Sequence, residues 1–118
     1  MSPRGTSDSS CIFCKIIKRE IPASIIEETP EMIAIRDINA QAPTHALIIP
    51  KDHIASIAEA DDALELGKLF QKACDIARQE RLVDGYRIVI NTGDDGGQTV
   101  HHLHIHVLGG RRLHWPPG

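Results

Sequence analysis

The chain has 118 residues and a formal net charge of −3, with 42% hydrophobic and 25% charged residues. This length allows one domain with a real hydrophobic core but not two. The small negative charge provides no basic field for a nucleic-acid backbone, and no apolar run reaches membrane-spanning length, so we expect neither partner.

The first ten residues are rich in Ser, Gly and Pro and lack the apolar stretch of a signal peptide. They predict a disordered tail over residues 1–10, followed by a single domain over residues 11–118. Three cysteines, an odd number, argue against a disulfide framework. They favour the reducing environment of a cytoplasmic protein.

The first chemical motif is Cys11-Ile12-Phe13-Cys14, at the head of a short helix predicted over residues 13–18. A Cys-x-x-Cys pair can bind one metal from a tight turn, but two thiolates supply only half of a tetrahedral zinc site. Distant histidines would have to supply the other half. A redox role needs a thioredoxin-like βαβ setting, which does not follow here. Zinc is therefore the favoured interpretation, and a pair of buried thiols is the alternative.

Two short strands, over residues 25–29 and 32–36, are predicted to form a hairpin around Pro30-Glu31. Asp37-Ile38-Asn39 ends the second strand. Asp37 is either a turn-former, because its side chain bonds nearby amides, or an acceptor for a ribose diol. In the second case Ile38 would pack against the sugar or the base.

A mostly apolar, central strand is predicted over residues 45–50, after the loop Ala42-Pro43-Thr44. It opens with His45, and a lone histidine at a strand start is usually structural. The long helix begins with the capping box Asp62-Ala63-Leu64-Glu65 and continues as one apolar stripe until Asp84-Gly85 stops it. Cys74 belongs to this helix and is interpreted as core packing.

A fourth strand is predicted over residues 86–91, and the loop 92–99 connects it to the next strand. The three glycines of this loop are more than a hairpin needs. Glycine lets backbone amides approach an anion closely, so the loop can cradle a phosphate. Taken alone, a Gly-rich hairpin is weak evidence for phosphate binding.

The last predicted strand is His102-Leu103-His104-Ile105-His106-Val107-Leu108, in which histidines alternate with aliphatic residues. The aliphatic side chains would face a core, and the three histidines would share the opposite face. Two such imidazoles can divide labour at one phosphorus atom, one attacking while the other donates a proton to the leaving group. The alternatives are a purification tag, a metal-binding run or a polar sheet face. A tag would not be interrupted by aliphatic residues.

The tail from Arg111 to Gly118 is short and is stiffened by Pro116-Pro117. Trp115 is either a core residue or, as is commoner for a lone Trp beside prolines at a chain end, packs against a partner surface.

The histidine pattern resembles the signature of the histidine triad family of nucleotide hydrolases and transferases. The resemblance is closest to its Hint branch, the purine nucleoside phosphoramidases. It extends from Ile12 onward and is carried by IFCKIIKREIP, RDINAQAPTHALIIPKDHI, GYRIVINTGDDGGQTVHHLHIHVLGG and HWPPG. These sections together are far more specific than the triad alone.

The resemblance implies roles for individual residues. His104 would attack the α-phosphorus through Nε2, His106 would contact the phosphate oxygens and the leaving group, and His45 would hold an imidazole's orientation and tautomer. The substrate would be bound by Asp37, Ile38, Asn91, Gly97, Gln98, Thr99, His106 and, from the tail that reaches toward the other subunit's site, Trp115. Thr99 stands where Ser is commoner, and His101 replaces a common aromatic residue.

The resemblance also completes the metal site. Some histidine triad proteins and the related uridylyltransferases pair two such cysteines with two histidines, at positions that match His53 and His102. Cys11, Cys14, His53 and His102 would then hold a structural zinc with no open position. No cluster of carboxylates indicates a catalytic magnesium site.

The expected fold is α+β, a HIT-like five-stranded antiparallel sheet with one long and one short helix, paired into a two-fold dimer that covers a sheet edge. The expected activity is hydrolysis of purine nucleoside phosphoramidates, including aminoacyl or lysyl adenylates, through a nucleotidyl-histidine intermediate. The alternatives are a dimeric nucleotide-binding adaptor with incidental turnover and a dinucleoside polyphosphate hydrolase. The ending HWPPG argues against the second, by resemblance.

Overall fold

The computed structural model describes residues 7–118. Of the tail predicted to be disordered, residues 1–6 lie outside the described residues. Ser9 and Ser10 form a turn, in which the Asp8 carbonyl accepts a hydrogen bond from the amide of Cys11 at 3.0 Å. The described part of the chain therefore begins beside the Cys-x-x-Cys motif.

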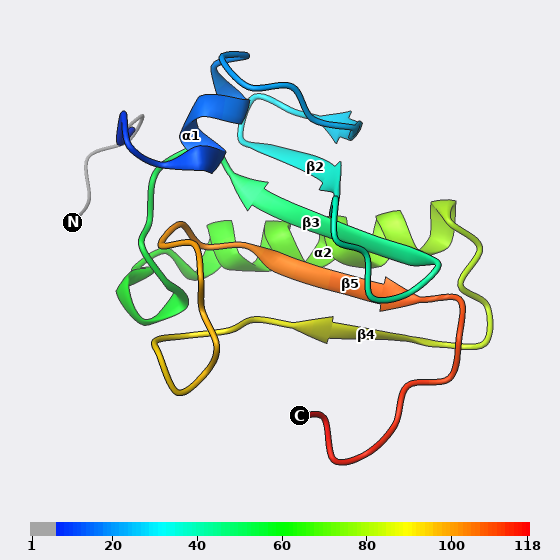
Figure 1. Cartoon of the computed structure of the whole chain (residues 1–118). Coiled ribbons are helices and arrows are strands. Elements are labelled where there is room, and N and C mark those ends of the chain that lie inside the picture. The colour runs from blue at the N-terminus through cyan, green and yellow to red at the C-terminus, as the bar shows by residue number, and fades with distance from the viewer. Residues whose placement is uncertain (1–6) are drawn as a thin grey trace.

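One antiparallel sheet of five strands forms the centre of the molecule, as predicted (Figure 1). The order of the strands in the sheet is β1-β2-β3-β5-β4, so β5, the last strand in the sequence, lies between β3 and β4. The strands are β1 (Ile25–Glu28), β2 (Met32–Arg36), β3 (Thr44–Pro50), β4 (Tyr86–Val89) and β5 (Ile105–Gly109). The sheet leaves one outer edge on β1 and the other on β4.

The long helix, α2 (Ala63–Gln79), begins at the predicted cap, where Asp62 Oδ1 accepts a hydrogen bond from the amide of Glu65 at 3.1 Å. It ends before the predicted Asp84-Gly85 stop. Arg81 adopts a left-handed backbone with φ of 59°, which turns the chain out of the helix. The other helices are α1 (Ile12–Ile17) and the short 3-10 helix η1 (Ile57–Glu59).

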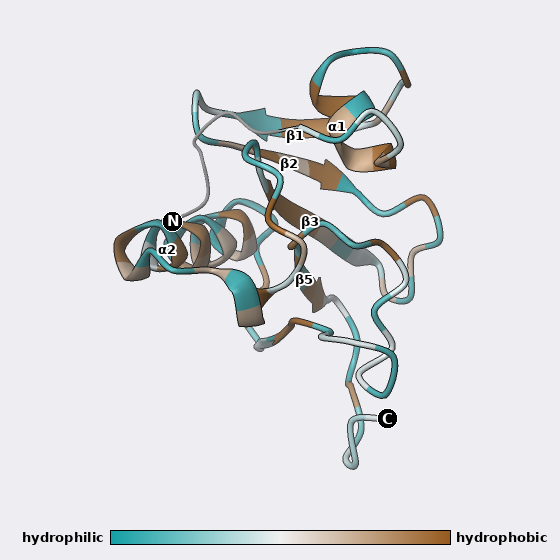
Figure 2. Cartoon of the chain, turned by 90° about the vertical axis from the view of Figure 1, so that its left-hand side faces the viewer, coloured by the Kyte–Doolittle hydropathy of each residue, from teal (hydrophilic) through white to brown (hydrophobic). Residues whose placement is uncertain are grey.

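The two faces of the sheet are covered by different helices (Figure 2). On one face α2 packs its apolar stripe against buried residues of β2, β3 and β5: Ala34, Ala46, Ile48, Ile105 and Val107. On the other face α1 packs against Ile33, Ile35, Leu47 and Ile49. Alternation along the strands places His45 and His106 on this second face, since His106 pairs with Leu47.

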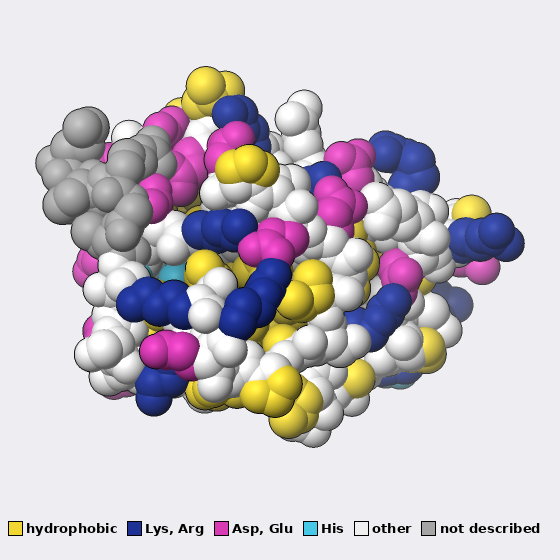
Figure 3. Space-filling model, turned by 90° about the horizontal axis from the view of Figure 1, so that it is seen from above, with side chains coloured by type: hydrophobic (Ala, Val, Ile, Leu, Met, Phe, Trp, Pro, Cys, Tyr) yellow, Lys and Arg dark blue, Asp and Glu magenta, His cyan; other side chains and the backbone are white. Residues whose placement is uncertain are grey.

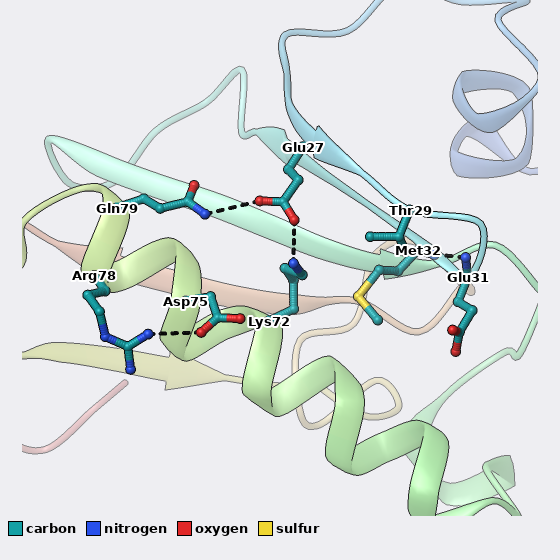
Figure 4. Close-up of polar contacts among 8 residues, drawn as sticks. All are labelled: Glu27, Thr29, Glu31, Met32, Lys72, Asp75, Arg78 and Gln79. Carbon is teal, nitrogen blue, oxygen red and sulfur yellow. Dashed lines mark hydrogen bonds and ion pairs between the residues drawn. The ribbon is translucent and has the colours of Figure 1, made fainter.

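Polar contacts join α2 to the sheet edge (Figure 4). Glu27 of β1 accepts hydrogen bonds from Lys72 and, at 3.1 Å, from Gln79. The hairpin between β1 and β2 is closed by Thr29, whose amide donates to the Met32 carbonyl at 2.9 Å. These contacts fix β1 on the rim of the sheet.

The predicted start of the last strand is wrong. The prediction was a strand over residues 102–108, but β5 begins at Ile105, and the first two histidines lie in the segment ahead of it. The last pair of the β3–β5 ladder is Ile48 with Ile105. β3 ends at Pro50, whose nitrogen carries no hydrogen and cannot continue the ladder.

The surface seen from above in Figure 1 carries both signs of charge (Figure 3). Glu28 forms ion pairs with Arg19 and, at 2.7 Å, with Lys51. No helix between residues 7 and 118 combines the length and the apolar character that crossing a membrane requires.

Candidate active site and metal cluster

Four parts of the chain meet on the α1 face of the sheet. β5 and the segment before it bring the three histidines, β3 brings His45, and the turn after β2 brings Asp37. The Cys-x-x-Cys loop approaches from α1, and the ring of Phe13 contacts the ring of His104 edge-on, with centroids 5.0 Å apart. The structure thus brings together the predicted catalytic histidines and the predicted metal ligands.

His104 is held as a neutral ring with a defined tautomer. Its Nδ1 lies 2.7 Å from the carbonyl oxygen of His102. A carbonyl can only accept, so Nδ1 carries the hydrogen and Nε2 is left with a free lone pair. Burial lowers the pKa of His104, which keeps this lone pair unprotonated near neutral pH. The ring has the form that a nitrogen nucleophile needs.

His106 is held as the opposite tautomer by a chain of hydrogen bonds. The amide of Gln41 donates to Nδ1 of His45 at 3.0 Å, so the hydrogen of His45 is on Nε2. His45 Nε2 lies 2.9 Å from Nδ1 of His106, which therefore accepts and leaves its own hydrogen on Nε2. That Nε2 is buried and has no partner among the described residues. A buried donor without a partner indicates a binding site.

The pKa of His106 is lowered to about 4, by burial first and then by the neighbouring His104 and His45. Its ring centroid lies 5.0 Å from that of His104. A ring with a lone pair on Nε2 therefore lies beside a ring with an N–H on Nε2, and the lowered pKa of each favours its neutral form.

Asp37 makes the turn-forming contact that the sequence allowed, and its role as a ribose acceptor stays a prediction. Its Oδ1 accepts from the amide of Asn39 at 2.8 Å, which is a turn-forming contact. Its Oδ2 lies 3.4 Å from Nε2 of His45 and so belongs to the histidine cluster. Ile38, beside it, is 99% exposed. An apolar side chain exposed next to the site is available to a ligand.

The glycine-rich loop uses part of its hydrogen-bonding capacity within itself. The amides of Gly97 and Gln98 donate to the carbonyls of Asp94 and Gly93, each at 3.0 Å. At Gly96 a Cβ would lie 2.3 Å from the Thr92 carbonyl oxygen, so the turn itself requires a glycine there. These glycines are explained by the loop's own shape, without a phosphate.

The side chain of Gln98 holds this loop in place by hydrogen bonds to three backbone groups. Its side-chain oxygen accepts from the amide of Gly93 at 3.0 Å, and its nitrogen donates to the carbonyls of Ala55 at 2.7 Å and Val100 at 3.0 Å. Asn91 is half-buried and Thr99 is exposed, so both side chains remain available to a ligand.

Trp115 is not brought to the histidines within the single chain. It is 82% exposed, and no ring contact among residues 7–118 joins it to a histidine. Its neighbour His114 is tied to β4, because Arg87 donates to the His114 carbonyl at 2.8 Å. The interpretation of Trp115 as a core residue is wrong.

The four predicted metal ligands form one cluster, with all four ligand atoms within 4.8 Å of one another. His102 Nδ1 lies 3.4 Å from Cys11 Sγ and 3.6 Å from Cys14 Sγ, and His53 Nδ1 lies 3.4 Å from Cys14 Sγ. Tetrahedral zinc with ordinary Zn–S and Zn–N bonds separates sulfur from nitrogen by roughly 3.6 Å. The spacing therefore fits zinc.

The hydrogen bonds around this cluster also fit a metal. His102 is fully buried, and its Nε2 lies 2.8 Å from the carbonyl of Pro50, which turns the Nδ1 lone pair toward the sulfurs. Burial raises the pKa of the Cys14 thiol, so without a cation the sulfur would keep its proton. A zinc ion would supply the charge that makes both sulfurs thiolates.

Two residues at the site were missed by the sequence reasoning. Phe13 was interpreted only as part of a short helix, yet its ring touches both His102 and His104. Its place inside the Cys-x-x-Cys motif was the available signal, because residues between two ligands must lie near the site. The Gln41 amide left no signal, since any residue except proline supplies one.

We predict that the purified protein carries about one zinc per chain. Replacing Cys11→Ser and Cys14→Ser together should remove the metal and lower the melting temperature, because half of the ligand set is gone. Cys74→Ser, in a half-buried cysteine of α2 outside the cluster, is the matched control and should keep the metal. Elemental analysis measures the zinc content, and thermal melting measures the stability. Zinc retained by the double variant would contradict the assignment.

The lowered pKa values predict how His104 and His106 titrate. Because burial depresses both, each ring should stay neutral as the pH falls through 6.5 and take up a proton only at lower pH, near 4 for His106. Ring signals followed by NMR against pH, with a histidine peptide as the reference, measure this. Protonation of His106 between pH 6 and 7 would contradict the burial argument.

Comparison with known proteins agrees with this geometry. The HIT domain family model matches residues 18–113. The chain is 52% identical to the 14 kDa zinc-binding protein of Zea mays, over 98% of this chain and 93% of that protein. It is 46% identical to adenylylsulfatase HINT1 of Arabidopsis thaliana, over 95% of this chain and 79% of that protein.

Solved structures show the same arrangement of strands and helices. A HIT family hydrolase from Legionella pneumophila Philadelphia 1 superposes with a TM-score of 0.89 at 49% identity, covering 92% of this chain and 99% of that one. Its agreement confirms the predicted fold of the single chain. The chain belongs to the HIT domain family and lies within its Hint branch.

Proposed function

We propose that this protein hydrolyses purine nucleoside phosphoramidates at the α-phosphorus in two displacements. As a member of a family whose relatives at 49% and 45% identity are HIT family hydrolases, the chain is a hydrolase of nucleotides. The observation that carries the finer proposal is the pair of opposite tautomers. A lone pair on His104 and an N–H on His106 lie on adjacent rings, which is what attack and leaving-group assistance require.

In the first displacement the lone pair on His104 Nε2 forms a bond to phosphorus as the P–N bond breaks. The hydrogen bond to the His102 carbonyl stabilises the positive charge that develops on the His104 ring. The departing nitrogen takes one proton from solvent and accepts a hydrogen bond from the Nε2–H of His106 as it leaves. In the second displacement water attacks phosphorus, the P–Nε2 bond breaks, and one proton of the water is released to solvent.

The substrate would be held by residues around this pair. Asp37 and Ile38 lie at the ribose, Thr99 and Asn91 lie at the phosphate, and His106 Nε2–H bonds a phosphoryl oxygen. Because the Gly97 and Gln98 amides donate within their loop, stabilisation of the phosphoryl charge falls chiefly on Thr99 and His106. A zinc ion held by Cys11, Cys14, His53 and His102 would be structural, since four protein ligands leave it no position for water.

A second substrate class deserves a direct comparison because of the Arabidopsis relative, whose name is adenylylsulfatase. Adenylyl sulfate offers the same phosphorus atom to His104, but its sulfate can leave without taking a proton. Turnover measured side by side on an adenosine phosphoramidate and on adenylyl sulfate decides between them. A nucleotide-binding adaptor would bind both and turn over neither.

His104→Asn should lower turnover of a fluorogenic adenosine phosphoramidate by more than about a hundredfold, because the nucleophile is removed. Nucleotide affinity and melting temperature should change little. His101→Asn, in an exposed histidine close by, is the control and should keep its activity. Rapid quenching of the wild type should trap a nucleotide on His104; more than a hundredth of the activity left in the variant would rule out the assignment.

The homodimer is part of the proposal. Among residues 7–118 the outer edge of β4 has no strand partner, and Tyr86, at its start, is 42% exposed. An unpaired edge is a template for a second chain, and a two-fold axis would place the exposed Trp115 tail against the partner.

Deleting residues 114–118 should change the preference among leaving groups more than it changes the melting temperature, because the exposed tail adds little to the core. Relative turnover of several phosphoramidates, together with sedimentation of both proteins, tests this. A monomeric wild type whose selectivity survives the truncation would contradict the dimer and the role of the tail.

A further inference from the structure

The chain that leaves β5 packs closely on the loop that carries Asp37. Gly110 makes the turn, with φ of +93°, and a Cβ there would lie only 2.9 Å from Cβ of Pro43. This close approach brings the next residue, Arg111, beside the loop over residues 37–43. The contact joins two segments that are far apart in the sequence.

Arg111 holds this loop by its backbone. Its Nε and Nη2 both donate to the carbonyl oxygen of Gln41, at 3.1 and 2.9 Å. Two bonds from a planar guanidinium to one oxygen fix the direction of that carbonyl. Within the loop, the Gln41 side chain donates to the Asn39 carbonyl at 2.9 Å, and the Asn39 amide donates to Asp37.

The same residue, Gln41, faces the histidines with its amide. That amide donates to His45 Nδ1 at 3.0 Å, and His45 Nε2 lies 2.9 Å from His106 Nδ1. If the amide turned away, Asp37 Oδ2, 3.4 Å from His45 Nε2, would be the remaining partner that favours hydrogen on Nε2, and a fraction of His45 could carry its hydrogen on Nδ1 instead. In that fraction His45 Nε2 would be an acceptor, and His106 would have to place its hydrogen on Nδ1 and lose the Nε2–H.

We propose that Arg111 is a positioning residue that, by holding Gln41, fixes the tautomer of His45 and so keeps the Nε2–H of His106 in the site. Within residues 7–118 the hydrogen bonds of Arg111 go to the carbonyls of Gln41 and Arg112, and none goes to a histidine. The consequence for turnover rests on the proposed function, whereas the consequence for the tautomers does not.

The contact between Arg111 and Gln41 is exposed, so it can orient the histidine rings without contributing much to global stability. Arg111 and Gln41 are both exposed, and hydrogen bonds of exposed guanidinium groups contribute little to global stability. His45 and His104, in contrast, are buried, where the direction of one N–H changes what the site can bind. Loss of Arg111 should therefore alter the rings while leaving the fold intact.

The test measures tautomers directly, by NMR of ring nitrogens in the full-length protein without substrate. The wild type should show His45 and His106 each with hydrogen on Nε2. In Arg111→Gln a second population of both rings, with hydrogen on Nδ1, should appear at an unchanged melting temperature. Arg111→Lys, which keeps the charge without the planar fork, should lie between. Arg112→Gln removes the same charge from the next residue and should match the wild type.

Turnover provides the second readout. Arg111→Gln should lower kcat on an amine-leaving adenosine phosphoramidate by about tenfold, the order expected when a directed hydrogen bond is lost, with KM changed less than twofold. Arg112→Gln should leave both kcat and KM at the wild-type values. Unchanged ring tautomers in Arg111→Gln, or the same change in Arg112→Gln, would overturn the inference. A wild type that turns over no phosphoramidate would instead overturn the proposed function, and the NMR result would still decide the role of Arg111.

Discussion

The site depends on the point at which the ladder between β3 and β5 stops. Pro50 has no N–H, so pairing ends with Ile48 and Ile105, and the segment carrying His102 is released from the sheet. The His102 carbonyl is then available to His104, at 2.7 Å, instead of bonding a neighbouring strand. The Pro50 carbonyl in turn receives Nε2 of His102. The end of this pairing thus leaves the His102 carbonyl free for His104, and the Pro50 carbonyl orients His102 toward the cysteines.

Burial acts together with the hydrogen bonds on the protonation of the histidines. Desolvation lowers the pKa of the three histidines on this face, so each can act as a neutral ring with one donor and one acceptor. Their partners then assign the hydrogens: a carbonyl for His104, another carbonyl for His102, and the Gln41–His45 chain for His106. Three residues of one type and one spacing thereby acquire three different hydrogen-bonding environments.

The sequence predicted the sheet, the long helix with its cap and the grouping of the histidines, because these follow from periodicity and from side-chain chemistry. It did not predict where β5 begins, because that point is set by the end of the pairing with β3, a strand more than fifty residues earlier in the sequence. Nor did it predict the amide of Gln41 or the internal bonds of the glycine loop, because backbone groups are common to nearly all residues. The place of Trp115 depends on a surface outside the single chain.

The strand order also governs when the site can form. β5 is synthesised after α2 and β4, yet it must insert between β4 and the central strand β3. Until it does, β3 exposes an apolar edge, and the cluster lacks His102, which is 91 residues from Cys11. Contacts of such long sequence separation form slowly, because the loop between them must close first. In a nascent chain Cys11 and Cys14 therefore lack His102 until synthesis is nearly complete, and the segment that ends in β5 completes both the histidine cluster and the Cys/His cluster.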